Sequence, residues 1–175
     1  MINEGYEKKK KFYAPAQAFE KITGYCAYQE RSHKEVRNKL YEYGLHRNDV
    51  DEILSRLITE KFLNEERFAK AFAGGKFRIK KWGRNKIVNE LASHGVTSKC
   101  IQKGLTEIDI ADYNKTLRNL LKRKLELIKE ENIFKKREKA ARFAIGKGYE
   151  SELVWGMLKE LDLTSNCKLS DKANR

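Results

Sequence analysis

The sequence predicts an all-α protein made of three tandem three-helix, helix-turn-helix-like repeats in an elongated or curved array. Two observations lead there. The chain of 175 residues has a single proline, Pro15, and is rich in Lys, Glu, Leu and Ala, which favours helices over a turn-rich β fold. It also resembles itself with a period of about fifty residues, because segments 32–57, 83–108 and 136–161 align with one another.

Each aligned segment has the pattern of a helix, a glycine, an apolar residue and a second helix. The glycines are Gly44, Gly95 and Gly148. Glycine suits this place because helices commonly end at a left-handed residue, where a side chain would clash. The apolar residues recur at helical spacing and predict buried stripes. They are Leu45, Val96 and Tyr149; Val36, Ile87 and Ala140; Leu40, Leu91 and Ala144; Val50, Ile101 and Val154; and Leu54, Leu105 and Leu158.

A further helical stretch precedes each pair of helices, at 15–30, 64–82 and roughly 111–132. Capping residues support the boundaries, since Ser32 with Glu35 forms a capping box and Asn48, Asn64 and Thr97 are suitable N-caps. We therefore expect a flexible basic N-terminus at 1–14, repeats at 15–60, 61–109 and 110–163, and a flexible C-terminus at 164–175. A unit of fifty residues buries little surface alone, so neighbouring units should stack.

The net charge of +13 points to a polyanionic partner. The charge is uneven along the chain. Residues 30–60 carry six cations and seven anions, whereas 76–103 carry eight cations against one anion and 110–148 carry twelve against five. The basic surface therefore belongs to the second and third repeats.

The stretch KFRIKKWGRNK, residues 76–86, combines six cations with two aromatic residues. On a helical wheel at about 100° per residue, one arc contains Phe68, Phe72, Gly75, Ile79 and Trp82, which predicts a core face. Phe77 falls among the lysines of the opposite side. We interpret it as an exposed ring that stacks on a base or fills a partner's pocket. The alternative is that the lysines form an ordinary solvated face and Phe77 packs on a neighbouring helix.

The sequence has no catalytic pattern, and we do not expect an enzyme. His33, His46 and His94 lack partners at motif spacing, and no P-loop, G-x-G-x-x-G or H-E-x-x-H is present. The spacing of the three cysteines fits no metal or redox site, so we interpret Cys26, Cys100 and Cys167 as reduced thiols. We expect no cofactor, no metal, no membrane span, and a monomeric protein of the cytoplasm.

Two neighbouring segments of the sequence resemble a known protein family. FLNEERFAKAF (62–72), followed by KFRIKKWGRNKIVNELASHGV (76–96), is similar to the central signature of the RecX proteins, bacterial regulators of the RecA recombinase. That signature has an acidic cluster before Arg-Phe-Ala, a basic stretch ending in Gly, and then Ile, Glu-Leu and Gly-Ile/Val. Asn64 stands where the family often has Asp, and Val96 where Ile is frequent.

The resemblance implies a modulator that lies in the groove of the RecA filament on single-stranded DNA and impedes strand exchange, ATP hydrolysis and LexA-type coprotease action. Double-stranded DNA is a further candidate partner. The cations of the signature are the first candidate contact residues, together with Phe77, and those of the third repeat, chosen for charge alone, come second. The full set is Lys76, Phe77, Arg78, Lys80, Lys81, Arg84 and Lys86, then Lys122, Arg123, Lys124, Lys135, Lys136, Arg137 and Arg142.

Two other functions fit the pattern less well. A DNA-binding protein of helix-turn-helix type could act without RecA, but the second helix of the first repeat begins NDVDE (48–52), whose acids repel phosphates. In the second repeat, SKCIQK (98–103) could still enter a groove. A structural helical adaptor for an acidic protein is the third hypothesis, and it predicts no dependence on nucleic acid.

Overall fold

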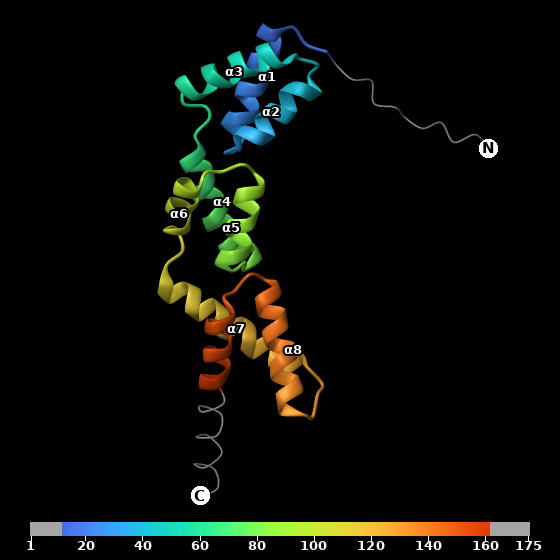
Figure 1. Cartoon of the computed structure of the whole chain (residues 1–175), viewed down its shortest axis with the longest axis vertical. Coiled ribbons are helices and arrows are strands. Elements are labelled where there is room, and N and C mark those ends of the chain that lie inside the picture. The colour runs from blue at the N-terminus through green and yellow to red at the C-terminus, as the bar shows by residue number, and fades with distance from the viewer. Residues whose placement is uncertain (1–11, 162–175) are drawn as a thin grey trace, which may run out of the picture.

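The structure, a computed structural model, describes residues 12–161. Over that range it contains nine helical segments and no strand, so the all-α prediction is confirmed (Figure 1). The helices are α1 (Pro15–Tyr28), α2 (His33–Glu42), α3 (Arg47–Thr59), α4 (Glu65–Lys80), α5 (Arg84–Ser93), α6 (Ser98–Leu105), α7 (Ile110–Leu127), α8 (Ile133–Gly146) and a last segment over residues 151–161.

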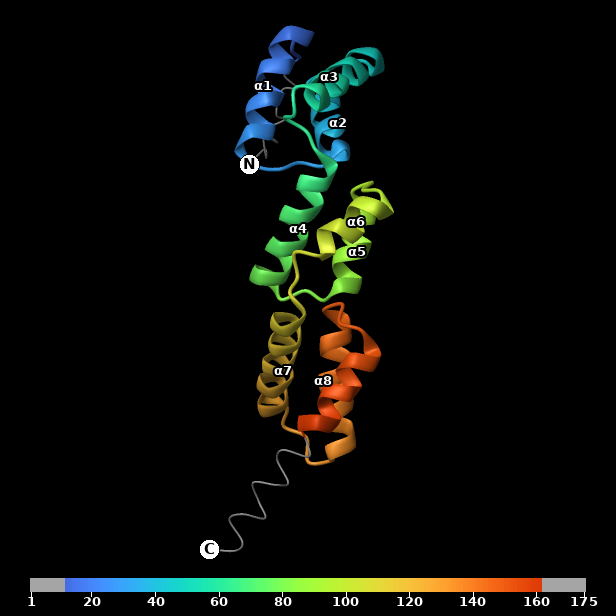
Figure 2. The ribbon, with the colours of Figure 1, turned by 90° about the vertical axis from the view of Figure 1, so that its left-hand side faces the viewer.

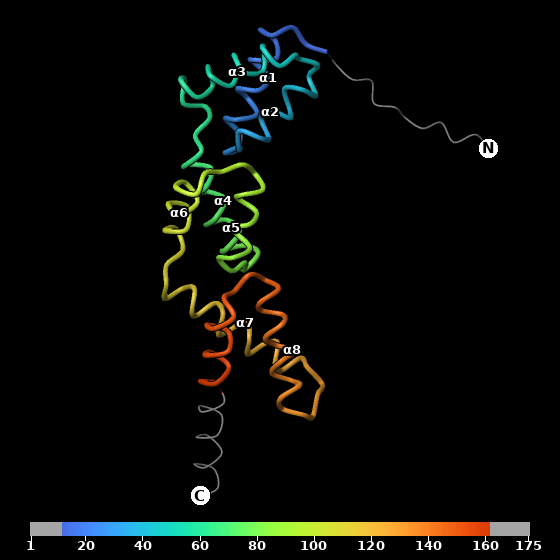
Figure 3. Tube along the Cα trace, viewed as in Figure 1, coloured from blue at the N-terminus to red at the C-terminus, as the bar shows by residue number. Residues whose placement is uncertain are grey.

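The helices form three successive three-helix units that stack end to end in an elongated body (Figures 1 and 2). The trace in Figure 3 passes from one unit to the next without returning to an earlier one. The predicted tandem array is therefore confirmed. The predicted tails lie mostly outside the described residues, which begin at Phe12 and end at Leu161.

The three aligned glycines have the backbone conformation that the repeat predicted. Their φ angles are +84° at Gly44, +77° at Gly95 and +93° at Gly148, all in the left-handed region. The aligned apolar residues are buried, apart from Leu105, which is half-buried. Each unit thus repeats the same helix-ending glycine and the same stripe of buried apolar residues.

The capping predictions are only partly correct. The capping box of Ser32 and Glu35 is present, and the Asn64 side chain accepts a hydrogen bond from the Arg67 N–H at 2.8 Å. Asn48 is not a cap, because α3 already begins at Arg47. Thr97 occupies the N-cap position of α6 but its side chain makes no capping bond, and its backbone N–H donates to the Glu65 carboxylate instead.

The predicted core face of α4 is only partly correct, because Phe68 is buried and Phe72 and Trp82 pack against the core, but Phe77 and Ile79 are misplaced. Phe77 is only 6% exposed and contacts Tyr113, whereas Ile79 is 77% exposed. The buried side of the helix also carries three small residues, Ala69, Ala73 and Gly74. They allow close packing of α6, where a Cβ on Gly104 would lie 2.8 Å from the Ala69 carbonyl oxygen. The positions of large apolar residues therefore did not predict which face of α4 packs against α6.

The described residues form two separate hydrophobic cores. One is confined to the first unit and runs from Ala18 to Leu63, while the other is shared by the second and third units and runs from Phe68 to Leu161. Backbone bonds reinforce the second joint: the Gly83 N–H donates to the Lys147 carbonyl at 2.8 Å, and the Asn85 N–H to the Gly148 carbonyl at 3.0 Å.

The joint between the first and second units is polar. Arg67 Nε lies 2.8 Å from Glu30 Oε1, and Lys34 Nζ donates to the Ser93 carbonyl at 2.9 Å. The Ser32 hydroxyl lies 3.3 Å from His94 Nδ1. The units therefore form one independent unit followed by a fused pair.

Candidate functional site

The six cations of residues 76–86 divide into two groups of three. Lys76, Arg84 and Lys86 are half-buried and cover aromatic rings. The Lys76 and Lys86 ammonium groups lie 5.1 and 4.6 Å from the centre of the Trp82 ring, and the Arg84 guanidinium lies 4.4 Å from that of Tyr113. These three side chains stabilise the joint region as well as supplying charge.

The other three cations, Arg78, Lys80 and Lys81, are exposed at the end of α4. Lys81 ends the helix in a left-handed conformation, with φ of +54°, and its ammonium group donates to the Arg78 carbonyl at 2.7 Å. These cations have no carboxylate partner among residues 12–161. They form the freely available part of the predicted basic stretch.

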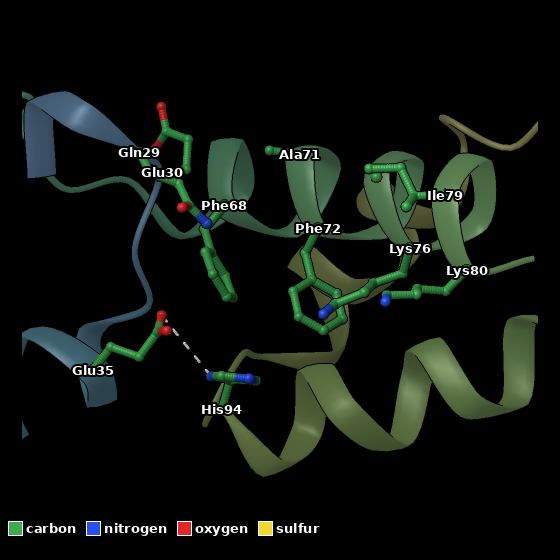
Figure 4. Close-up of a pocket in the computed structure, with 11 residues that line it drawn as sticks. Gln29, Glu30, Glu35, Phe68, Ala71, Phe72, Lys76, Ile79, Lys80 and His94 are labelled. Carbon is green, nitrogen blue, oxygen red and sulfur yellow. Dashed lines mark ion pairs between the residues drawn. The ribbon is translucent and has the colours of Figure 1, made fainter. Parts of the chain in front are cut away.

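A groove of about 430 Å³, here called the junction groove, lies between the first unit and α4 (Figure 4). Phe68, Phe72 and Ile79 supply its apolar lining, and the side chains of Lys76 and Lys80 reach along it from α4. The Lys76 ammonium group lies 4.9 Å from the centre of the Phe72 ring. Two of the aromatic residues that the wheel assigned to the core, Phe68 and Phe72, therefore also line a groove, whereas Trp82 packs against the core outside it.

The two ends of the junction groove carry opposite charge. Glu30 and Glu35 lie at the end formed by the first unit, where Glu35 faces His94 at 4.0 Å (Figure 4). Lys76 and Lys80 lie toward the other end. A segment bound there would have to place an acidic group on the side of α4.

The candidate cations of the third unit are spread over two helices. Lys122 and Arg123 are exposed on α7, while Lys124 is half-buried with its ammonium group 4.7 Å from the centre of the Phe143 ring. On α8, the Arg142 guanidinium lies 3.5 Å from Glu138, and Arg137 lies over the Phe134 ring at 6.0 Å. Lys135 is exposed and Lys136 half-buried on the same helix.

A second pocket, here called the α7–α8 pocket, joins the two predicted groups of cations. It has a volume of about 400 Å³, and it brings Lys81 of the second unit together with Arg123 and Lys124 of the third. The remaining lining residues are neutral: Thr116, Asn119, Leu120, Leu127 and Phe143. The sequence could not pair Lys81 with α7, because their proximity depends on how the second and third units meet.

Phe143 is the aromatic residue of this lining, and like the neutral residues beside it, it was not among the predicted site residues. It lies on α8 in a segment rich in lysine and arginine, where it is an isolated aromatic residue. Its ring is half-buried and has the ammonium groups of Lys124 and Lys147 at 4.7 and 5.5 Å from its centre. A search for aromatic residues between cations would have selected it.

The possible recognition helix of the second unit, α6, is buried on one side and exposed at its N-terminal residues Ser98 and Lys99. α6 packs against α4 and buries Ile101 and Gly104. Of its cations, Lys103 is paired with Glu66 at 2.5 Å, and this hydrogen bond, with a second from Lys70, lowers the pKa of Glu66. Within the described residues, Lys99 is therefore the cation of α6 that has no carboxylate partner to compete with phosphate.

Neither a metal cluster nor a membrane span occurs in the part of the chain that the structure covers. Over residues 12–161, no three His, Cys, Asp or Glu side chains gather as a metal site requires, and no helix is long and apolar enough to cross a bilayer. Cys26 and Cys100 are free thiols, and burial raises the pKa of Cys26 to about 11. Cys167 lies outside the described residues.

An elongated helical stack with unpaired cations at the second joint defines a class: an all-α repeat protein whose surface is suited to binding. Comparison with known protein families identifies the family within this class. Three family models match in order: "RecX, first three-helix domain" at residues 18–57, "RecX, second three-helix domain" at 64–105 and "RecX, third three-helix domain" at 111–158. The chain belongs to the RecX family of regulatory proteins.

Relatives and solved structures agree with this assignment. The chain is 30% identical over 133 residues to "Regulatory protein RecX" of Clostridium perfringens (strain 13 / Type A), which covers 75% of this chain and 62% of that protein. It is 28% identical over 144 residues to the RecX protein of Prosthecochloris aestuarii, covering 82% and 93%. The chain thus spans less than two thirds of some relatives.

The fold matches "Crystal structure of RecX from Lactobacillus salivarius" with a TM-score of 0.76. That match has 20% sequence identity and covers 85% of this chain and 97% of the other. At this identity the likeness supports the fold alone.

Proposed function

We propose that the chain regulates the RecA recombinase by binding the RecA filament on single-stranded DNA, and that it thereby inhibits strand exchange, ATP hydrolysis and coprotease action. The observation that carries the proposal is the match of all three RecX domains, in order, to one elongated body. An elongated stack presents a longer contact surface to a filament than a compact domain of the same number of residues does.

The exposed cations at the end of α4 are the proposed first contact with the filament. Arg78, Lys80 and Lys81 project into solvent without carboxylate partners in the range 12–161. Charge of this kind guides association and makes it depend on salt. Lys76, Arg84 and Lys86 add to the field, but they are also held by aromatic rings.

Binding to filaments assembled on single-stranded DNA with a slowly hydrolysed ATP analogue tests this proposal. We expect the double variant Lys80→Gln/Lys81→Gln to bind more weakly and with a smaller dependence on salt. The matched control is Lys115→Gln/Lys129→Gln, which removes the same charge from exposed positions of the third unit. Equal binding by the Lys80/Lys81 variant and the unmodified chain would refute the assignment of these cations.

A further inference from the structure

The α7–α8 pocket has a lining suited to more than a phosphate. Three cations lie on it, Lys81, Arg123 and Lys124, and no acidic residue does. Other cations of the same unit are neutralised, as where Arg118 meets Glu160 at 2.5 Å and Lys139 meets Glu130 at 2.7 Å. Within residues 12–161, Arg123 and Lys124 have no such carboxylate. Uncompensated positive charge at close range favours an anion.

The same pocket contains an aromatic ring and two leucines. Phe143 is half-buried, while Leu127 is 76% exposed and Leu120 packs partly on the core. A simple inorganic anion would contact the three cations but leave the apolar surface beside them unused. The pocket fits a ligand with a charged group and a flat apolar face next to each other, which describes a nucleotide.

The Phe143 ring can exchange its present neighbours for a base. The ammonium groups of Lys124 and Lys147 now lie over it, and a stacked base makes a stronger contact with an aromatic ring than one ammonium group does. Displacement would also free the Lys124 ammonium group, now 4.7 Å from the ring centre, to meet a phosphate. Stacking and phosphate binding would thus support each other.

The pocket keeps its shape because it spans the rigid joint. Lys147, whose ammonium group lies over the ring, accepts the Gly83 N–H through its backbone carbonyl at 2.8 Å. Lys81 precedes Gly83 by two residues. The walls contributed by the second and third units are therefore fixed to each other by main-chain contacts, and binding need not order them.

We propose that the α7–α8 pocket binds one nucleotide of a single nucleic-acid strand, with its base on Phe143 and its phosphate at Lys81, Arg123 and Lys124. A duplex fits poorly, because its bases are stacked on one another and cannot offer a free face. The inference deepens the proposed function by giving the chain a direct contact with the strand, and it can fail independently of that function.

The test measures binding of the full chain to a fluorescent oligothymidylate and to an abasic strand of equal length, over a range of salt concentrations. We expect Phe143→Leu to weaken oligothymidylate binding about tenfold and to leave abasic binding unchanged. Arg123→Gln/Lys124→Gln should weaken binding to both strands and lower the salt slope by about 1.4, or 0.7 for each lost contact. The control Lys115→Gln/Lys129→Gln should retain the slope and affinity. Circular dichroism establishes that each variant is folded.

Three results would overturn the proposal. The first is a Phe143→Leu protein that binds oligothymidylate as tightly as the unmodified chain. The second is a control variant that loses as much salt slope as the pocket variant. The third is displacement of the strand by polyglutamate with equal dependence on Phe143, which would assign the pocket to an acidic protein. If RecA ATP hydrolysis is still inhibited by Phe143→Leu and the strand data are negative, only the pocket assignment fails. If the unmodified chain does not inhibit RecA, the strand data still decide the pocket.

Discussion

Two buried tyrosines at the second joint differ in how their hydroxyl groups are used. Their rings lie 4.9 Å apart, between centres. The Tyr113 hydroxyl accepts a hydrogen bond from the Arg84 N–H at 3.0 Å and donates to Glu150 at 2.7 Å. The buried Tyr149 hydroxyl has no hydrogen-bond partner in the described part of the chain. One hydroxyl therefore links the units, and the other is buried at a cost.

We expect opposite results from removing these hydroxyls. Tyr113→Phe should lower the free energy of unfolding by roughly 1–3 kcal/mol, because it leaves a backbone donor and a carboxylate without their partner. Tyr149→Phe should leave stability unchanged or raise it by about 1 kcal/mol, because no hydrogen bond is lost. Urea unfolding measures both. A loss for Tyr149→Phe equal to that for Tyr113→Phe would show that Tyr149 has a partner.

Alkaline pH should destabilise the same joint. Burial raises the pKa of Tyr149 to about 12 and also raises the pKa of Tyr113, whereas an unfolded tyrosine titrates near pH 10. Above about pH 10 the unfolded chain loses these protons and the folded chain keeps them, so stability is full below that pH and falls as pH rises. Thermal melts at pH 9 to 11 check this. Tyr149→Phe should decline less steeply, and equal slopes would contradict the assignment.

The least accurate predictions from the sequence concerned the exposure of single residues on α4. Phe77 and Ile79 exchange places relative to the helical wheel, because α4 is buried on the side that carries Ala69, Ala73 and Gly74. A wheel weighted by side-chain size cannot detect packing through small residues. The basic residues were predicted as a group, but their division into ring-covering and exposed cations depends on where Trp82 and Tyr113 lie.

At the scale of single helices, the close approach of α4 and α6 is the most demanding contact. A Cβ on Gly104 would meet the Ala69 backbone at 2.8 Å, whereas a Cβ on Gly75 would have no neighbour within 4 Å. The repeat predicted where these helices lie and how they end, since the glycine turns depend on local backbone chemistry. It did not predict which faces meet.

This contact predicts opposite effects for two glycine substitutions in the same unit. Gly104→Ala should lower stability by roughly 1–3 kcal/mol, because backbone cannot move aside as a flexible side chain can. Gly75→Ala should raise it by roughly 0.5–1 kcal/mol, because alanine is favoured over glycine within a helix. The midpoints of thermal melts give the comparison. If Gly104→Ala is neutral, α4 and α6 are not packed this closely.

For the whole molecule, the division into one unit and a fused pair has consequences for unfolding. The first core contains residues from Ala18 to Leu63, and the second and third units share the other. Repetition in the sequence could not reveal this, because each copy reports only its own buried stripe. The joints depend on single features such as Gly83, where a Cβ would lie 2.2 Å from the Gly148 carbonyl carbon.

We therefore expect two cooperative transitions. Hydrogen exchange followed by mass spectrometry should show helices α1 to α3 opening apart from the rest, and α4 to residue 161 opening together. Tyr113→Phe should speed exchange in the second and third units and leave the first unchanged. A single opening event over residues 12–161 would mean that the polar first joint couples the units as strongly as the second does.

The proposed action on the RecA filament predicts the outcome of one titration. RecA ATP hydrolysis on single-stranded DNA is measured with increasing amounts of the chain, beside its binding to the same bare DNA at the same salt concentration. We expect hydrolysis to fall well below the concentration that coats the DNA. Hydrolysis that falls only once the bare DNA is saturated would mean that competition for DNA is sufficient, and would contradict an action on the filament.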